Sequence, residues 1–146
     1  MSNLNNPIFS FEDKSLPLGF SIPDMSMFGM LKFSAKSQPD ALAYEYFGTQ
    51  CTYRELVQKI EKISGAYYSL GVRKGDIVTI IMPNTPEAVV SIYALNRIGA
   101  VSNILHPLSA QEEIKSHINR VDSKFLLCVD ICSEKIANVI NETSLE

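Results

Sequence analysis

The sequence predicts an α/β domain in which a three-stranded parallel sheet carries helices on both faces. Runs of strand length recur at residues 77–82, 100–105 and 124–129, and the first of them is continuously apolar. Segments with helical periodicity separate these runs, and residues that begin or end helices stand at the junctions. Strands that alternate with helices form parallel sheets through right-handed crossovers. We therefore expect the order β-α-β-α-β-α, preceded by a helix and a β-hairpin that forms a small satellite sheet.

The amino-terminal part of the chain precedes this pattern. Residues 1–23 are rich in Asn, Ser and Pro and show no period, which predicts an extended or disordered amino-terminal arm. Residues 25–37 follow a helix-compatible pattern with Asp24 as the expected N-cap. Pro39 ends that helix, because the residue before a proline avoids helical backbone angles. We assign residues 24–146 to a single α/β subdomain.

A hairpin and a second helix are expected next. Residues 41–47 and 50–52 are two short strand patterns around a Gly-containing turn. Thr52 and Glu55 fit the capping box T-x-x-E, so the second strand should lead directly into a helix. Gly71 ends this helix, whose apolar residues share one face: Leu56, Val57, Ile60, Ile63, Tyr67 and Leu70.

The first strand and helix of the sheet are marked most clearly. The continuous apolar run 77–82 suits a strand that is buried on both faces of a parallel sheet. Thr85 is the expected N-cap of the following helix and Pro86 its first residue. Gly99 stands where a helix most often ends. Residues 100–105 then return to strand.

The last third of the chain repeats this alternation. Ser109 and Glu112 fit a second capping box, which predicts a helix with an apolar side formed by Ile114, Ile118 and Val121. Residues 124–129 predict a third buried strand. From Ser133 onward the pattern indicates a fourth helix.

Composition excludes several classes of function. The chain is 46% hydrophobic and 20% charged, with a net charge of −3, which is ordinary for a globular domain. Its Lys and Arg residues are scattered, so no nucleic-acid partner is expected. No apolar run approaches the ~18 residues of a spanning helix, and the start lacks the features of a signal peptide. Three cysteines, an odd number, indicate free thiols in the cytoplasm.

Few residues are candidates for catalysis, metal binding or phosphate binding. The seven glycines form no phosphate-binding loop, and neither histidine has a partner at metal-ligand spacing. His106 follows the carboxyl end of a strand, where doubly wound sheets bind ligands, although an ordinary loop histidine before Pro107 explains it more simply. Asp130 also ends a strand, but a phospho-accepting receiver needs acidic residues after the first strand, where the chain has Met82-Pro83-Asn84. No catalytic residue can be nominated.

Four short motifs occur in order between Thr52 and Val101: TYREL, LGVRKGDIV, MPNTPE and NRIGAV. Together they resemble the amino-terminal region of the adenylate-forming (AMP-binding) superfamily of acyl-CoA synthetases, luciferases and peptide-synthetase adenylation domains. The resemblance extends from about Asp24 to Val129. The sequence after Gly99 and around Pro86 is more similar to the acyl-CoA synthetase branch than to peptide-synthetase domains.

The resemblance implies an intact cytoplasmic enzyme of fatty-acid metabolism. Such an enzyme activates a carboxylic acid with ATP and Mg²⁺ as an acyl-adenylate and passes the acyl group to coenzyme A. The family's phosphate loop, its ribose-binding aspartates and its carboxy-terminal domain with the catalytic lysine would follow Glu146. We therefore expect this chain to be an inactive amino-terminal fragment that binds no cofactor alone, with the remainder of the ligase as its partner.

Only one candidate site follows from the resemblance. In some acyl-CoA synthetases, the loop that matches His106, Pro107 and Leu108 lies beside the pantetheine path of coenzyme A. The family's loop is often rich in glycine, and this one is not. Two alternatives stay open: an adenylation domain that serves a carrier protein, and a free-standing binding or scaffold module. A fragment should also expose apolar surface and self-associate.

Overall fold

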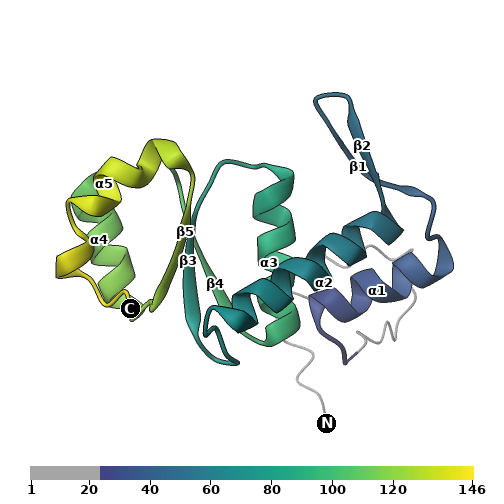
Figure 1. Ribbon diagram of the computed structural model, residues 1–146, viewed down its shortest axis with the longest axis horizontal. Helices are drawn as coiled ribbons and strands as arrows, with labels where there is room; N and C mark the ends of the chain where they lie inside the picture. Colours follow the sequence, from purple (N-terminus) through teal and green to yellow (C-terminus); the bar gives the residue numbers. More distant parts are fainter. Residues whose placement is uncertain (1–23) are drawn as a thin grey trace, which may run out of the picture.

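The structure is a computed structural model, and it describes residues 24–146 (Figure 1). The amino-terminal arm expected at residues 1–23 lies outside the described residues. In chain order the elements are α1 (Met27–Ser37), β1 (Leu42–Tyr46), β2 (Thr49–Thr52), α2 (Tyr53–Ser69), β3 (Ile77–Ile81), α3 (Pro86–Ile98), β4 (Val101–Leu105), α4 (Gln111–Arg120), β5 (Phe125–Cys128), η2 (Asp130–Cys132), α5 (Ser133–Ala137) and η3 (Ile140–Glu142).

The main sheet is parallel and has the strand order β4-β3-β5. Val78 in the central strand lies opposite Ser102 on one side and Phe125 on the other. The chain therefore passes from β4 back across β3 to reach β5. Figure 1 shows α2 and α3 on one side of the sheet and α4 and α5 on the other. This arrangement, with the separate antiparallel pair β1–β2, confirms the predicted fold class.

Alternate side chains of β3 build two cores. Val78 and Ile80 pack with Leu95 of α3 in one cluster. Ile81 packs with Ile114 and Ile118 of α4 in the other. This two-sided burial explains why the first strand of the sheet reads as a continuous apolar run rather than an alternating one.

A network of hydrogen-bonded polar side chains crosses the sheet. The Thr79 hydroxyl is buried and donates to the Ser123 hydroxyl at 2.8 Å. It also accepts from the Asn103 side-chain amide at 3.1 Å. Ser123 in turn donates to the backbone oxygen of Ile77 at 3.1 Å. These bonds join all three strand segments and satisfy hydroxyls that would be costly to bury unpaired.

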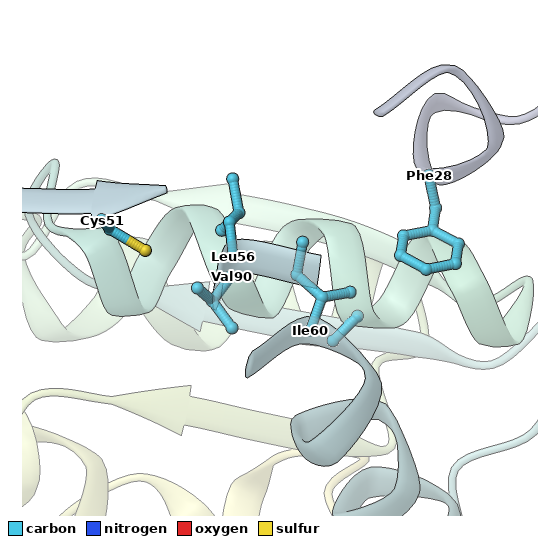
Figure 2. Close-up of a cluster of buried hydrophobic side chains, with 6 residues drawn as sticks. Phe28, Cys51, Leu56, Ile60 and Val90 are labelled. Atoms are coloured by element: carbon cyan, nitrogen blue, oxygen red, sulfur yellow. The ribbon is translucent and has the colours of Figure 1, made fainter. Parts of the chain in front are cut away.

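A third core lies between the helices and the hairpin. Figure 2 shows Phe28 at one end of this cluster and Cys51 at the other, with Leu56, Ile60 and Val90 also drawn. The side-chain oxygen of Asn96 in α3 accepts from the Phe28 amide at 3.0 Å, which ties the start of α1 to α3. The amino-terminal helix is therefore an integral part of the domain.

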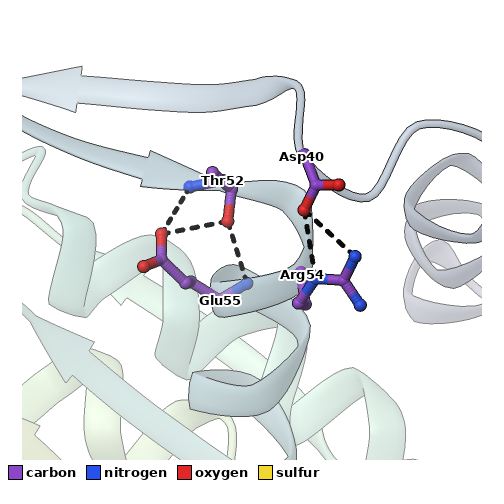
Figure 3. A network of polar contacts seen from close by, with 4 residues as sticks. All are labelled: Asp40, Thr52, Arg54 and Glu55. Carbon is purple, nitrogen blue, oxygen red and sulfur yellow. Dashed lines mark hydrogen bonds and ion pairs between the residues drawn. The ribbon is translucent and has the colours of Figure 1, made fainter.

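Several local predictions are confirmed. The Thr52 hydroxyl accepts from the Glu55 amide at 3.3 Å while the Glu55 carboxylate accepts from the Thr52 amide at 2.8 Å, so the capping box of α2 is complete (Figure 3). Arg54 pairs with Asp40 at 3.0 Å beside it. Thr85 caps α3, Pro86 is its first residue, and Gly99 ends it in the left-handed conformation.

Other local predictions were wrong at the helix starts. The N-cap of α1 is Ser26 rather than Asp24, since the Ser26 hydroxyl accepts from the Gly29 amide at 3.1 Å. The second capping box does not form. Ala110 is the N-cap of α4 and offers no side-chain acceptor, because Ser109 belongs to the preceding turn.

Two predictions near the carboxyl end also need correction. The helix expected from Ser133 ends at Ala137, where Asn138, a weak helix former, leads to a buried Val139 and a short 3₁₀ turn. The strand β5 is half-buried rather than buried, because β3 is its sole neighbour in the described part of the sheet.

Candidate functional site

The carboxyl ends of the three parallel strands meet at one edge of the sheet. The segments that leave this edge are residues 82–85 after β3, 106–110 after β4 and 129–130 after β5. The chain diverges here toward opposite faces of the sheet. In doubly wound folds, ligands bind at this position. The sequence-predicted loop of His106, Pro107 and Leu108 therefore lies where the fold favours a site.

This loop is a closed turn. The backbone oxygen of His106 accepts from the Ser109 amide at 3.0 Å. The His106 Nδ1 atom accepts from the Leu108 amide at 3.1 Å. Because Nδ1 acts as an acceptor, the proton of the neutral imidazole resides on Nε2. His106 and Leu108 are both exposed, and Leu108 reaches 79%.

The segment after β5 supports the loop. The Cys132 thiol donates to the backbone oxygen of Pro107 at 3.5 Å, and Cys132 is buried. The Lys135 ammonium donates to the backbone oxygen of Ser109 at 3.3 Å. Sequence reasoning missed both residues as supports of the loop. No motif marks them, because their role depends on how the segment after β5 returns to the loop after β4, although β3 lies between these two strands.

The other two segments use their polar groups locally. The Thr85 hydroxyl accepts from the Ala88 amide at 3.4 Å as part of the α3 cap. The Asp130 carboxylate accepts from the Ile131 amide at 2.9 Å, and the Ile131 side chain is exposed. This edge of the sheet thus offers one imidazole nitrogen and apolar side chains, but no paired acid and base and no activated nucleophile.

The described residues do not fit ATP with its metal ion. Residues 24–146 contain no group of three His, Cys, Asp or Glu side chains that could hold a metal. A helix start can bind phosphate through free amides and a positive dipole end. However, α3 begins with a proline that has no amide and then Glu87, and α4 carries Glu112 and Glu113 in its first turn. These charges oppose a phosphate.

His117 lies on α4, and of the three cysteines Cys132 is the one that donates to the loop. His117 Nε2 is 4.0 Å from the Glu113 carboxylate on the surface of α4. All three cysteines are free, as the sequence predicted. Burial, with a smaller contribution from nearby Cys132, raises the pKa of the Cys128 thiol, so this sulfur is a weak nucleophile at neutral pH.

Comparison with known proteins gives the family. The model of the AMP-binding enzyme family matches residues 31–146. The chain belongs to the AMP-binding enzyme family. Acetyl-coenzyme A synthetase 1 of Saccharomyces cerevisiae is 36% identical over 84 residues, which are 57% of this chain and 12% of the yeast protein. The 4-coumarate–CoA ligase 4 of Arabidopsis thaliana is 30% identical over 95 residues, 65% of this chain and 17% of that ligase.

Solved structures show the same fold. A long-chain-fatty-acid–CoA ligase from Archaeoglobus fulgidus superposes with a TM-score of 0.81 at 22% identity over 87% of this chain and 27% of its own. The amino-terminal subdomain of NpsA from Klebsiella oxytoca gives a TM-score of 0.69 at 25% identity over 72% of this chain and 28% of its own. This AMP-binding chain thus spans only 12% to 17% of the curated relatives named above.

The structure also bears on the membrane. Every helix between residues 24 and 146 is too short or too polar to cross a bilayer.

Proposed function

We propose that the chain is the amino-terminal piece of an ATP-dependent, AMP-forming acyl-CoA ligase. The observation that carries the proposal is the family match over residues 31–146, combined with relatives that are acetyl-CoA synthetases and a 4-coumarate–CoA ligase. The intact enzyme would activate a carboxylic acid as an acyl-adenylate and transfer the acyl group to coenzyme A. Residues 24–146 would form one subdomain of it.

The piece itself is proposed to be non-catalytic. ATP and Mg²⁺ supply the adenylation chemistry in the intact enzyme, and the described residues hold neither a phosphate cradle nor a metal site. The acidic first turns of α3 and α4 point to the same conclusion. The contribution of this piece is therefore structural: it presents the strand ends and the loop after β4 to the remainder of the ligase.

The loop of His106, Pro107 and Leu108 is proposed to lie beside coenzyme A. Hydrogen bonds from Cys132 and Lys135 to its backbone support the loop in the observed conformation. The exposed Leu108 side chain offers an apolar contact for a pantetheine arm, and the free Nε2 of His106 offers one hydrogen bond to an amide oxygen. No proton transfer is assigned to this histidine.

We also propose that β4, which is an edge strand in the described part of the sheet, forms a contact surface with one exposed apolar residue on each face. Val101 and Ile104 of β4 are 51% and 59% exposed, although both are β-branched apolar residues in a sheet. The remainder of the ligase would cover them in the intact protein, and a second copy would cover them in the isolated chain. Sedimentation velocity should show concentration-dependent association that Ile104→Lys weakens. A monomer at all concentrations would contradict this assignment.

Cytoplasmic location and a role in fatty-acid metabolism are part of the proposal. The three free thiols support a reducing compartment. An adenylation domain that serves a carrier protein is the main alternative for the acceptor, and a free-standing scaffold module is the alternative for the whole chain.

One experiment separates these possibilities. The reading frame is extended beyond codon 146, and the longer protein is assayed for acyl-CoA formation with free coenzyme A. We expect His106→Ala to raise the KM for coenzyme A while carboxylate-dependent ATP–pyrophosphate exchange is retained. His117→Ala, on the surface of α4, is the matched control and should change neither. Exchange without any transfer to free coenzyme A favours the carrier-protein alternative, and a stop codon after Glu146 favours the scaffold module.

A further inference from the structure

Three reactive side chains meet at the base of the hairpin, away from the candidate site. The Lys59 ammonium on α2 donates to the Tyr44 hydroxyl of β1 at 3.1 Å. The same ammonium donates to the Cys51 sulfur of β2 at 3.6 Å. Cys51 is only 1% exposed and lies at the end of the helix–hairpin core (Figure 2). A lysine nitrogen therefore stands in contact with a buried thiol on another element.

The cluster is open on the lysine side. Lys59 is exposed, and a polar groove of about 250 Å³ lined by it, Gln50, Glu55, Gln58 and Lys62 opens to solvent. The Cys51 thiol also lies 3.6 Å from the backbone oxygen of Thr52, to which it donates. Cys51 does not line this groove, so an oxidant as small as hydrogen peroxide must pass the exposed Lys59 side chain to reach the buried sulfur.

We propose that Cys51 and Lys59 form a peroxide-sensitive covalent pair, in which oxidation of the thiol leads to a bond between Sγ and Nζ. The oxidant is hydrogen peroxide. The partner nitrogen is already within 3.6 Å, so the bond forms without moving either backbone segment far. Hydroxyl-bearing sulfur condenses with nearby nucleophiles in this way, and nitrogen is among them.

The reaction balances in two steps. First the Cys51 sulfur attacks one peroxide oxygen, the O–O bond breaks, and sulfenic acid and water form. Then the lone pair of the neutral Lys59 amine attacks the sulfur, the S–O bond breaks, and the hydroxyl leaves as water with a proton from the nitrogen. The sum is RSH + R′NH₂ + H₂O₂ → RS–NHR′ + 2 H₂O. Sulfur is oxidised by two electrons, and peroxide is reduced. Two equivalents of a thiol reverse the bond and leave their own disulfide.

The protonation of Lys59 sets the pH dependence of the link. Its contact with the Tyr44 hydroxyl raises the pKa of Lys59. The other ionisable groups around the ammonium are Cys51 on β2 and, on its own helix, Glu55 and Lys62. The second step needs the neutral amine, whose fraction rises about tenfold per pH unit below this pKa. When this step limits the rate, linking should accelerate in the same proportion. Loss of the Tyr44 hydroxyl should accelerate it further at a fixed pH.

The link would be a reversible covalent cross-link within the domain. It would join the second hairpin strand to α2 next to the complete capping box of Thr52 and Glu55 (Figure 3). The hairpin would then be covalently fixed to the helical part of the domain under oxidising conditions and released by thiols.

The test is peptide mapping of the chain after treatment with hydrogen peroxide at pH 7.5 and pH 9. Trypsin should release residues 37–54 joined to residues 55–62, with two hydrogen atoms less than the sum of the two peptides. The missed cleavage after Lys59 is part of the expected result. Dithiothreitol should restore the separate peptides.

Four variants sharpen the result. Lys59→Arg keeps the charge at an exposed position and should abolish the linked peptide, as should Cys51→Ser. Lys62→Arg, in the same groove, is the matched control and should leave the yield unchanged. Tyr44→Phe should raise the yield several-fold at pH 7.5. Oxidation of Cys51 to sulfinic acid without a link, a link that contains an additional oxygen atom, or a link that persists in Lys59→Arg would each overturn the proposal.

Discussion

The strands β3 and β4 are neighbours of equal length, but their surroundings differ. The described side chains of β3 are buried almost throughout, because the strand has a partner on each side and helices on both faces. In β4, Val101 and Ile104 are more than half exposed. Both strands contain β-branched apolar residues, although β4 also carries Ser102 and Asn103. The difference teaches that apolar composition predicts a strand, whereas the number of its neighbours depends on the rest of the protein.

The strongest way to sharpen this comparison is to truncate one isoleucine in each strand. Ile80→Ala in β3 should lower the free energy of unfolding by about 2–5 kcal/mol, because it leaves a cavity between the sheet and α3. Ile104→Ala in β4 is the matched control and should change it by less than about 0.5 kcal/mol. Urea unfolding followed by circular dichroism measures both, at a protein concentration at which sedimentation shows a monomer, so that no second copy covers β4. Equal losses would show that β4 is already covered in the isolated chain.

Breaking the network of polar side chains across the sheet should give the next largest loss in the free energy of unfolding. Thr79→Val keeps the shape of the side chain but removes its bonds to Ser123 and Asn103. We expect a loss of about 1–3 kcal/mol, because buried polar groups lose their partners. Ser102→Ala on the half-buried neighbouring position of β4 is the control. If Thr79→Val stabilised the chain, the network would have no role in joining the strands.

Substitutions at two helix starts should change the stability in opposite directions. Thr52→Ala removes the cap of α2 and should cost about 1 kcal/mol. Ala110→Asp adds a missing acceptor to the start of α4 and should stabilise by about 0.5–1 kcal/mol. Thermal unfolding of both variants tests this pair. A destabilised Ala110→Asp would mean that this position is already optimal for another reason.

The smallest expected effect is the pH dependence of the α2 cap. Hydrogen bonds from the Thr52 backbone and side chain lower the pKa of Glu55 below its ordinary value of 4.5. The unfolded chain therefore binds this proton at a higher pH than the folded chain. The contribution to stability is present above the ordinary value and disappears as the pH falls through the lower folded value. Glu55→Gln should reduce the slope of the free energy of unfolding against pH between pH 5 and pH 3, by the contribution of one carboxyl group. An unchanged slope would contradict the role of Glu55.

Local signals account for what the sequence predicted well. The helix caps act within one helical turn, so neighbouring residues in the sequence are enough to predict them. The examples are Thr52 with Glu55 in α2, and Pro86 and Gly99 in α3. The failures arise where a competing turn or a distant contact decides the local structure. Ser109 is drawn into the turn that begins at His106, so the cap expected there does not form.

The candidate site shows the same limit. Position after a strand and the family resemblance predict a site at His106, Pro107 and Leu108, and these residues lie at the carboxyl edge of the sheet. Cys132 and Lys135 fix their conformation from more than twenty residues away in the chain. No pattern in the sequence marks these two residues. Their role follows only from strand order, which places β5 on the far side of β3.

The most direct test of the account is carboxylate-dependent ATP–pyrophosphate exchange, measured on the isolated chain and on the protein extended beyond Glu146. The acids to be used are acetate, a cinnamic acid derivative and a long-chain fatty acid, which span the relatives and structures it matches. We predict no exchange above background for the isolated chain and Mg²⁺-dependent exchange for the extended protein. Robust exchange by the 146-residue chain alone would contradict the conclusion that it is a non-catalytic piece of a ligase.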